Sequence, residues 1–146
     1  MIGSPSTDLI VLPRSFVVVV NLLDTMRALA SKGEVVTLQS GDVLFRSGEM
    51  GTSMYGILEG TVRLTWTAKD GKEGYEDIKA GNVFGAGALV MHNHQRLGTA
   101  TAAEHTRLIE MNREKFLFAM QEAPMFAIEL LASVDERLRD IKLASS

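Results

Sequence analysis

The sequence predicts a mainly β protein with flanking α-helices: an antiparallel β jelly-roll barrel with a short N-terminal helix and C-terminal helices. Between positions 34 and 111, short stretches rich in β-branched and aromatic residues are separated by regularly placed glycines, a pattern typical of short strands joined by turns. On either side, apolar residues recur three and four positions apart, as in amphipathic helices. We therefore expect one domain with three parts, namely a tail and helix (1–32), a barrel (33–111) and C-terminal helices (112–146).

Composition limits the classes of function. The chain of 146 residues has single-domain size, and it has no cysteine for a disulfide or thiolate site. Its net charge of −3 argues against nucleic-acid binding by this chain alone. The apolar run Phe16–Val20 is far shorter than the roughly 20 residues of a membrane span. The charged residues Asp24 and Arg27, which follow this run, argue against a signal peptide. We expect a cytoplasmic protein with no membrane partner.

The elements follow in order. Met1–Thr7 is expected to be a loose terminus. Leu22, Met26 and Leu29 recur at helical spacing up to Gly33, which predicts the short first helix. The sequence Lys69-Asp70-Gly71 indicates a hairpin turn. The predicted strands are Glu34–Leu38, Val43–Phe45, Ser53–Glu59, Thr61–Thr67, Glu73–Ile78, Gly98–Ala102 and Thr106–Met111.

Two helices are predicted after the last strand. Asn112 can cap the first, which runs through Phe116 and Met120, and Pro124 suits the first position of the second. The second helix carries an apolar seam in steps of three and four residues. Such a seam can pack on the chain's own barrel or on a second copy of the chain, so we expect either a packed helix or a homodimer helix. The seam residues are Leu131, Val134, Leu138 and Ile141.

The candidate site lies between Gly81 and Met111. The glycine-rich turn Gly85-Ala86-Gly87 precedes a small-residue segment, and Arg96 follows ten residues later. Free backbone N–H groups at a helix start beside a guanidinium suit a phosphate-sized anion. The sequence therefore predicts a site for a small anionic ligand.

Four consecutive motifs resemble the cyclic-nucleotide-binding domain family, in its catabolite activator protein-like form. The first is GDVLF-x-x-GE from Gly41, the second is YGILEGTV from Tyr55, and the third and fourth form the phosphate-binding cassette and the strand after it. By this resemblance the ligand-binding residues are Phe84, Gly85, Ala86, Gly87, Ala88, Leu89, Arg96, Leu97, Gly98 and Thr99.

The resemblance implies a sensor or regulatory module, including the effector domain of a transcription regulator. Arg96 would pair with the phosphate of cyclic AMP or cyclic GMP. Ala86 stands where the family has a glutamate that binds the ribose, and Leu97 stands where a hydroxyl often faces the phosphate. We therefore expect weakened or altered nucleotide binding. Relatives move a hinge that corresponds here to Phe116–Pro124.

Two alternatives stay open. One is a ligand-free protein-interaction barrel in which Arg96 serves a contact within the fold. The other is a cupin-type metal-dependent enzyme that uses His92 and His94, because imidazoles two residues apart on a strand can share a metal. However, the glutamate that a cupin places after such a pair is missing, and we see no catalytic triad or paired carboxylates. We expect neither catalytic residues nor a metal site.

Overall fold

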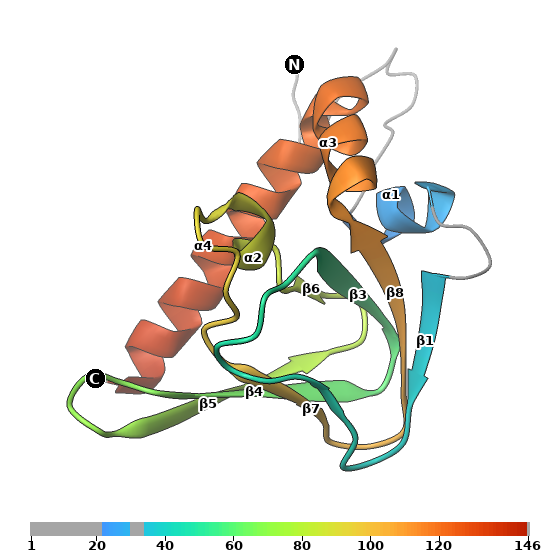
Figure 1. The fold of residues 1–146 in the computed structure, drawn as a ribbon. Helices are drawn as coiled ribbons and strands as arrows, with labels where there is room; N and C mark the ends of the chain where they lie inside the picture. Colours follow the sequence, from blue (N-terminus) through green and yellow to red (C-terminus); the bar gives the residue numbers. More distant parts are fainter. Residues whose placement is uncertain (1–21, 30–33, 146) are drawn as a thin grey trace, which may run out of the picture.

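The computed structural model describes residues 22–29 and 34–145, and its strands form two four-stranded antiparallel sheets (Figure 1). One sheet has the order β1-β8-β3-β6 and the other the order β2-β7-β4-β5. Most strands that pair within a sheet are distant in sequence, because the chain passes repeatedly from one sheet to the other. This arrangement confirms the predicted jelly roll. The strands are β1 Val35–Leu38, β2 Val43–Phe45, β3 Ser53–Glu59, β4 Thr61–Thr67, β5 Glu73–Lys79, β6 Val83–Phe84, β7 Thr99–Ala102 and β8 Thr106–Asn112.

All seven predicted strands are present, and the bounds of β2, β3 and β4 are as predicted. The other four differ from the prediction by one residue at one end. The sequence analysis missed β6 and the short helix α2 (Gly87–Val90), because segments of two and four residues are too short to show a period. Pairing with Tyr55 and Gly56 of β3 defines β6.

Three longer helices flank the roll: α1 (Leu22–Leu29), α3 (Arg113–Glu122) and α4 (Pro124–Ser145). The side chain of Asn112 accepts a hydrogen bond from the Lys115 backbone N–H at 2.9 Å, which confirms the predicted cap. Pro124 opens α4, as predicted. The predicted terminus Met1–Thr7, the run Phe16–Val20 and Gly33 lie outside the described residues.

The helices pack on one sheet. In Figure 1, α1 and α3 lie at one end of the roll and α4 runs from α3 toward the tip of the β4–β5 hairpin. Met26, Met54, Phe116 and Phe126 are each at most 4% exposed and belong to one cluster between these helices and the sheet that contains β3. A second cluster, which includes Ile57, fills the space between the sheets. The first turn of α4 is therefore firmly packed.

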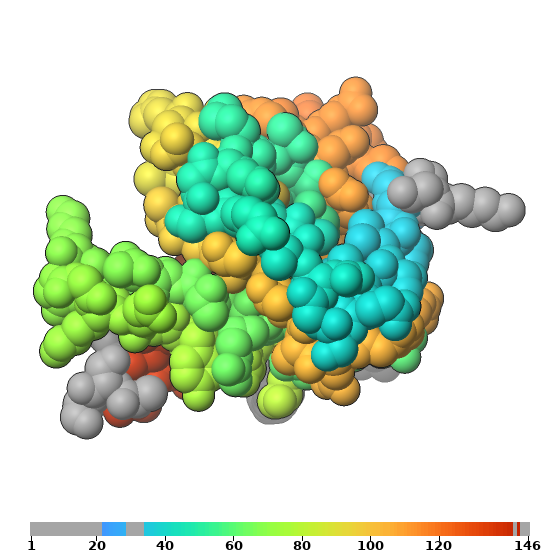
Figure 2. Space-filling view, turned by 60° about the horizontal axis from the view of Figure 1, so that its bottom comes forward, coloured from blue at the N-terminus to red at the C-terminus, as the bar shows by residue number. Residues whose placement is uncertain are grey.

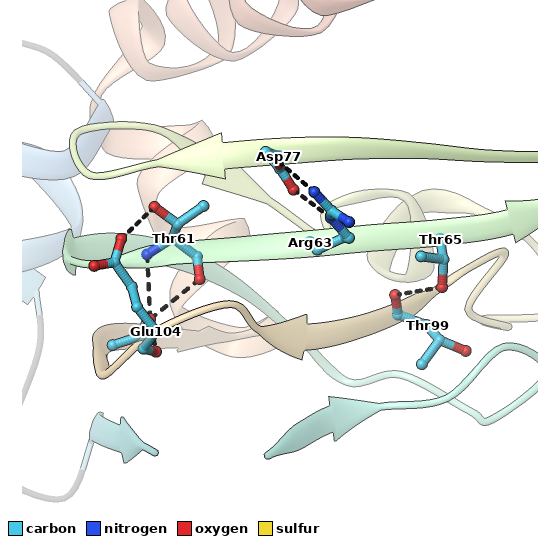
Figure 3. A network of polar contacts seen from close by, with 7 residues as sticks. Thr61, Arg63, Thr65, Asp77, Thr99 and Glu104 are labelled. Carbon is cyan, nitrogen blue, oxygen red and sulfur yellow. Dashed lines mark hydrogen bonds and ion pairs between the residues drawn. The ribbon is translucent and has the colours of Figure 1, made fainter. Parts of the chain in front are cut away.

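Polar contacts join the strands of the second sheet (Figure 3). Arg63 on β4 donates to both carboxylate oxygens of Asp77 on β5, at 2.7 and 2.9 Å. The hydroxyl of Thr61 donates to the Glu104 carboxylate at 2.7 Å. The first contact joins the two strands of the β4–β5 hairpin, and the second ties the hairpin to the turn between β7 and β8.

Within the part of the chain that the structure describes, no single helix is both long and apolar enough to cross a membrane. Residues 113–122 and 124–141 reach that length and hydropathy when taken together, but they are bent by 112° where they meet.

Candidate functional site

The turn after β6 opens the site. Gly85 has φ +87°, in the left-handed region that glycine adopts without strain. The chain then enters α2, where the Leu89 N–H donates to the Ala86 carbonyl and the Met91 N–H to the Gly87 carbonyl, both at 2.9 Å. The glycine-rich turn thus leads into a single helical turn.

The side chain of Arg96 lies against the turn at Gly85, and the residue is only 5% exposed. Its Nη1 donates to the Gly85 carbonyl at 2.8 Å, and its Nη2 donates to the Ser53 carbonyl at 2.6 Å. The guanidinium carbon lies 4.1 Å from the centre of the Phe45 ring. A Cβ at Gly51 would lie 2.4 Å from the Arg96 Nε, so glycine at that position leaves the space that the guanidinium fills.

Burial and nearby charges shift the pKa of the Arg96 guanidinium in opposite directions. Burial lowers the pKa of Arg96, and the nearby Tyr55, Glu110 and Glu49 oppose that shift. Burial also raises the pKa of Tyr55, and Glu110 adds to the rise. Arginine remains protonated at neutral pH in either case, so the site contains a buried cation.

The chain itself engages two of the five N–H groups of this cation. Nη1 and Nη2 each donate once to a backbone carbonyl, and the Nε is buried without a partner among the described residues. An anion that binds Arg96 would therefore share the guanidinium with the Gly85 and Ser53 carbonyls. Sequence analysis could not foresee this, because Ser53 is 43 residues away.

A cavity of about 570 Å³, here called the barrel cavity, lies next to Arg96, and its size suits a small organic ligand. Figure 2 shows the surface indented between the β4–β5 hairpin, in green, and the part of the cassette that follows α2, in yellow. Most of its lining is apolar. The large apolar side chains are Phe45, Leu64, Trp66, Met91, Leu97 and Ile141.

A second hollow of about 620 Å³, here called the α4 groove, lies between α4 and the turn that contains Ala86. The seam residues Leu131, Val134, Leu138 and Ile141 all line it. The first three are 42–70% exposed. The predicted dimer seam therefore forms the open wall of a groove.

The structure brings most of the predicted ligand-binding residues together. Gly85, Gly87, Ala88, Arg96, Leu97 and Gly98 line the barrel cavity. Ala86 lines the α4 groove. Phe84 and Leu89 are 1% exposed and belong to the core. Thr99 accepts a hydrogen bond on its Oγ1 from the Ser47 backbone N–H at 3.1 Å.

The residues that line the barrel cavity without having been predicted include Trp66, Glu76 and Arg137. On β4 and β5, Leu64 pairs with Glu76 and Trp66 with Gly74. Inward positions alternate along these strands, so a carboxylate on the inward face was a detectable signal. Arg137 lies between Val134 and Leu138 on α4, where we considered only the apolar members of the seam.

The two histidines considered for a metal are placed in a surface loop. The His94 Nδ1 lies 2.8 Å from the Ala88 carbonyl, and His94 has φ +53°. Among residues 22–29 and 34–145, no three His, Cys, Asp or Glu side chains are grouped so that they could hold a metal. The cupin alternative gains no support.

Comparison with known proteins agrees with this geometry. A family model described as cyclic nucleotide-binding domain matches residues 35–123. The Cyclic AMP receptor protein of Thermus thermophilus is 32% identical over 104 residues, covering 70% of this chain and 48% of that protein. Lysophospholipase nte1 of Neurospora crassa is 34% identical over 111 residues, covering 73% of this chain and 7% of that protein. The chain thus spans about half of one relative and a small part of the other.

Solved structures show the same fold. The Catabolite Activator Protein of Thermus thermophilus has a TM-score of 0.69 at 27% identity, covering 84% of this chain and 56% of that chain. The sensor domain of the transcriptional regulator DNR from Pseudomonas aeruginosa has a TM-score of 0.61 at 25% identity, covering 82% and 78%. The predicted fold class and family resemblance are confirmed.

Proposed function

Since this chain belongs to the cyclic nucleotide-binding domain family, we propose that it is a non-catalytic sensor module whose barrel cavity takes a small anionic ligand. The observation that carries the proposal is a cavity of ligand size between the cassette and α4, with Arg96 at its inner end. Names of similar proteins, a cyclic AMP receptor and the sensor domain of a transcriptional regulator, support a role as the effector domain of a regulator.

We further propose that cyclic AMP and cyclic GMP bind this module weakly. Ala86, which lines the neighbouring α4 groove, offers no carboxylate to a ribose, and Leu97 offers no hydroxyl. Two N–H groups of Arg96 already donate to backbone carbonyls. A hydrogen bond to a charged group contributes roughly 1.5–3 kcal/mol. Each 1.4 kcal/mol is about a tenfold change in affinity, so one missing bond weakens binding by roughly 10–100-fold.

Calorimetric titration tests this proposal. We expect no binding of cyclic AMP or cyclic GMP at micromolar concentration by the unmodified chain. Ala86→Glu should strengthen cyclic AMP binding by roughly 10–100-fold, and Arg96→Ala should remove it. Ala103→Glu and Arg46→Ala, at exposed positions, are matched controls that should change neither affinity. Micromolar or tighter binding by the unmodified chain would contradict the weak-binding proposal.

The second candidate is the ligand-free interaction barrel, which the two carbonyl contacts of Arg96 favour. It predicts that Ala86→Glu gains no affinity for either nucleotide, and that simple organic acids also give no heat on titration. Loss of folding in Arg96→Ala without any ligand response in folded variants would support this second function over the first.

Homodimer formation through Leu131, Val134, Leu138 and Ile141 belongs to the same proposal. Exposed apolar residues at heptad-like spacing lose contact with water when a second helix covers them. Sedimentation velocity at rising concentration should show a dimer, and Leu131→Glu should shift the chain to a monomer. The exposed substitution Arg139→Glu on the same helix is the control. A strictly monomeric unmodified chain at high micromolar concentration would count against this interface.

A further inference from the structure

The second half of α4 is joined to the roll by Arg137. Its Nε and Nη2 donate to the two carboxylate oxygens of Glu76 at 2.7 and 2.9 Å, and its Nη1 donates to the Val83 carbonyl at 3.1 Å. Phe126 and Leu130 bury the start of the helix. From residue 131 onward, no side chain that the structure describes is buried. The forked ion pair is therefore a polar link between this half of α4 and the roll.

This ion pair also forms a partition. Glu76 and Arg137 line both the barrel cavity and the α4 groove. Glu76 faces inward on β5, opposite Leu64, and its side chain is 16% exposed, against 27% for that of Arg137. The Glu76 carboxylate and the Arg137 guanidinium thus lie between the barrel cavity and the α4 groove.

Two guanidinium groups therefore line the same cavity, with different partners. Arg96 binds backbone carbonyls, which cannot leave without moving β3 or the cassette. Arg137 donates once to the Val83 carbonyl, but its other two bonds go to a side-chain carboxylate, which can rotate away. A planar guanidinium that pairs with both oxygens of a carboxylate can pair in the same way with another carboxylate or with a phosphate. Lys69 also lines the cavity, from the hairpin turn.

We propose that Arg137 is a second anion-recognising group of the barrel cavity, in addition to Arg96, and that the Glu76 carboxylate competes with a ligand anion for it. A ligand anion takes the place of the Glu76 carboxylate on Arg137, and the second half of α4 is then released from β5. This inference rests on the proposed sensor function for its ligand, whereas the role of the pair in holding α4 needs no ligand.

The ligand-free part is tested by hydrogen–deuterium exchange over α4. Glu76→Gln and Arg137→Gln should each raise amide exchange in residues 131–143 several-fold and leave residues 113–122 unchanged. The charge swap Glu76→Arg with Arg137→Glu should restore protection. Arg139→Gln is the matched control, because Arg139 pairs with Asp135 on the exposed side of the same helix at 3.3 Å. Sedimentation of each variant ensures that one oligomeric state is compared.

The ligand-dependent part uses Trp66, the single tryptophan of the chain, which lines the barrel cavity. Its fluorescence is followed while cyclic AMP or inorganic phosphate is added. Glu76→Gln should bind the added anion about tenfold more tightly than the unmodified chain, since the competing carboxylate is gone. The double variant Glu76→Gln with Arg137→Gln should lose that gain.

The two readouts separate the possible failures. Unchanged exchange in both single variants would overturn the role of the pair in holding α4. Equal anion affinity in Glu76→Gln and the unmodified chain would overturn the competition. If the exchange changes occur but no variant, Ala86→Glu included, binds cyclic AMP or phosphate, the proposed sensor function fails while the structural role of the pair is supported.

Discussion

Arg96 in the cassette and Arg137 on α4 line one cavity, yet they are held in opposite ways. Arg96 is sealed in the roll, with carbonyls of two separate segments on its terminal nitrogens and the Phe45 ring against its face. Arg137 extends from α4 and donates twice to the Glu76 side chain and once to the Val83 carbonyl. The buried arginine is built into the fold, whereas the outer one can change partner.

The largest expected effect separates the two arginines by stability. Arg96→Ala leaves buried carbonyls without a donor, each costing about 1–3 kcal/mol, and should lower the free energy of unfolding by about 2–4 kcal/mol. Arg137→Ala breaks a partly exposed pair and should cost about 1 kcal/mol or less. Urea denaturation measures both. Similar losses in the two variants would remove the distinction.

A smaller effect tests how Arg96 is accommodated. Gly51→Ala places a Cβ 2.4 Å from the Arg96 Nε, so the guanidinium must shift. Overpacking of this kind costs about 1–3 kcal/mol. Gly87→Ala is the control, because a Cβ there meets nothing within 4 Å. If Gly51→Ala unfolds at the same urea concentration as the unmodified chain, Arg96 is less firmly seated than its contacts indicate.

The smallest effect appears only at alkaline pH. Burial and Glu110 raise the pKa of Tyr55 above its ordinary value of 10.0, so the folded chain holds this proton more tightly than the unfolded chain. The resulting stability is fully present below pH 10.0 and declines as the pH rises through the pKa of the folded state. Tyr55→Phe should flatten this decline in unfolding experiments between pH 9 and 11. An equally steep decline in the variant would assign it to other groups.

Local patterns predicted the elements well. The β-rich runs of β3 and β4 and the turn at Lys69-Asp70-Gly71 depend on neighbours in sequence, and the structure has them at the predicted positions. The order of four motifs also placed the cassette, although its roles in ligand binding stay a prediction. The prediction for β5 did not include the inward carboxylate of Glu76, although alternation along a strand indicates which residues face inward.

The sequence by itself determined the strands, the capped helices, the family and the absence of a glutamate at position 86, because periodicity and motif spacing are local properties. Only the tertiary structure decided which partners the cations bind. Arg96 meets Ser53 across 43 residues and Arg137 meets Glu76 across 61. Such pairs arise when the order of strands and the course of α4 bring distant segments together, and no local pattern encodes that meeting.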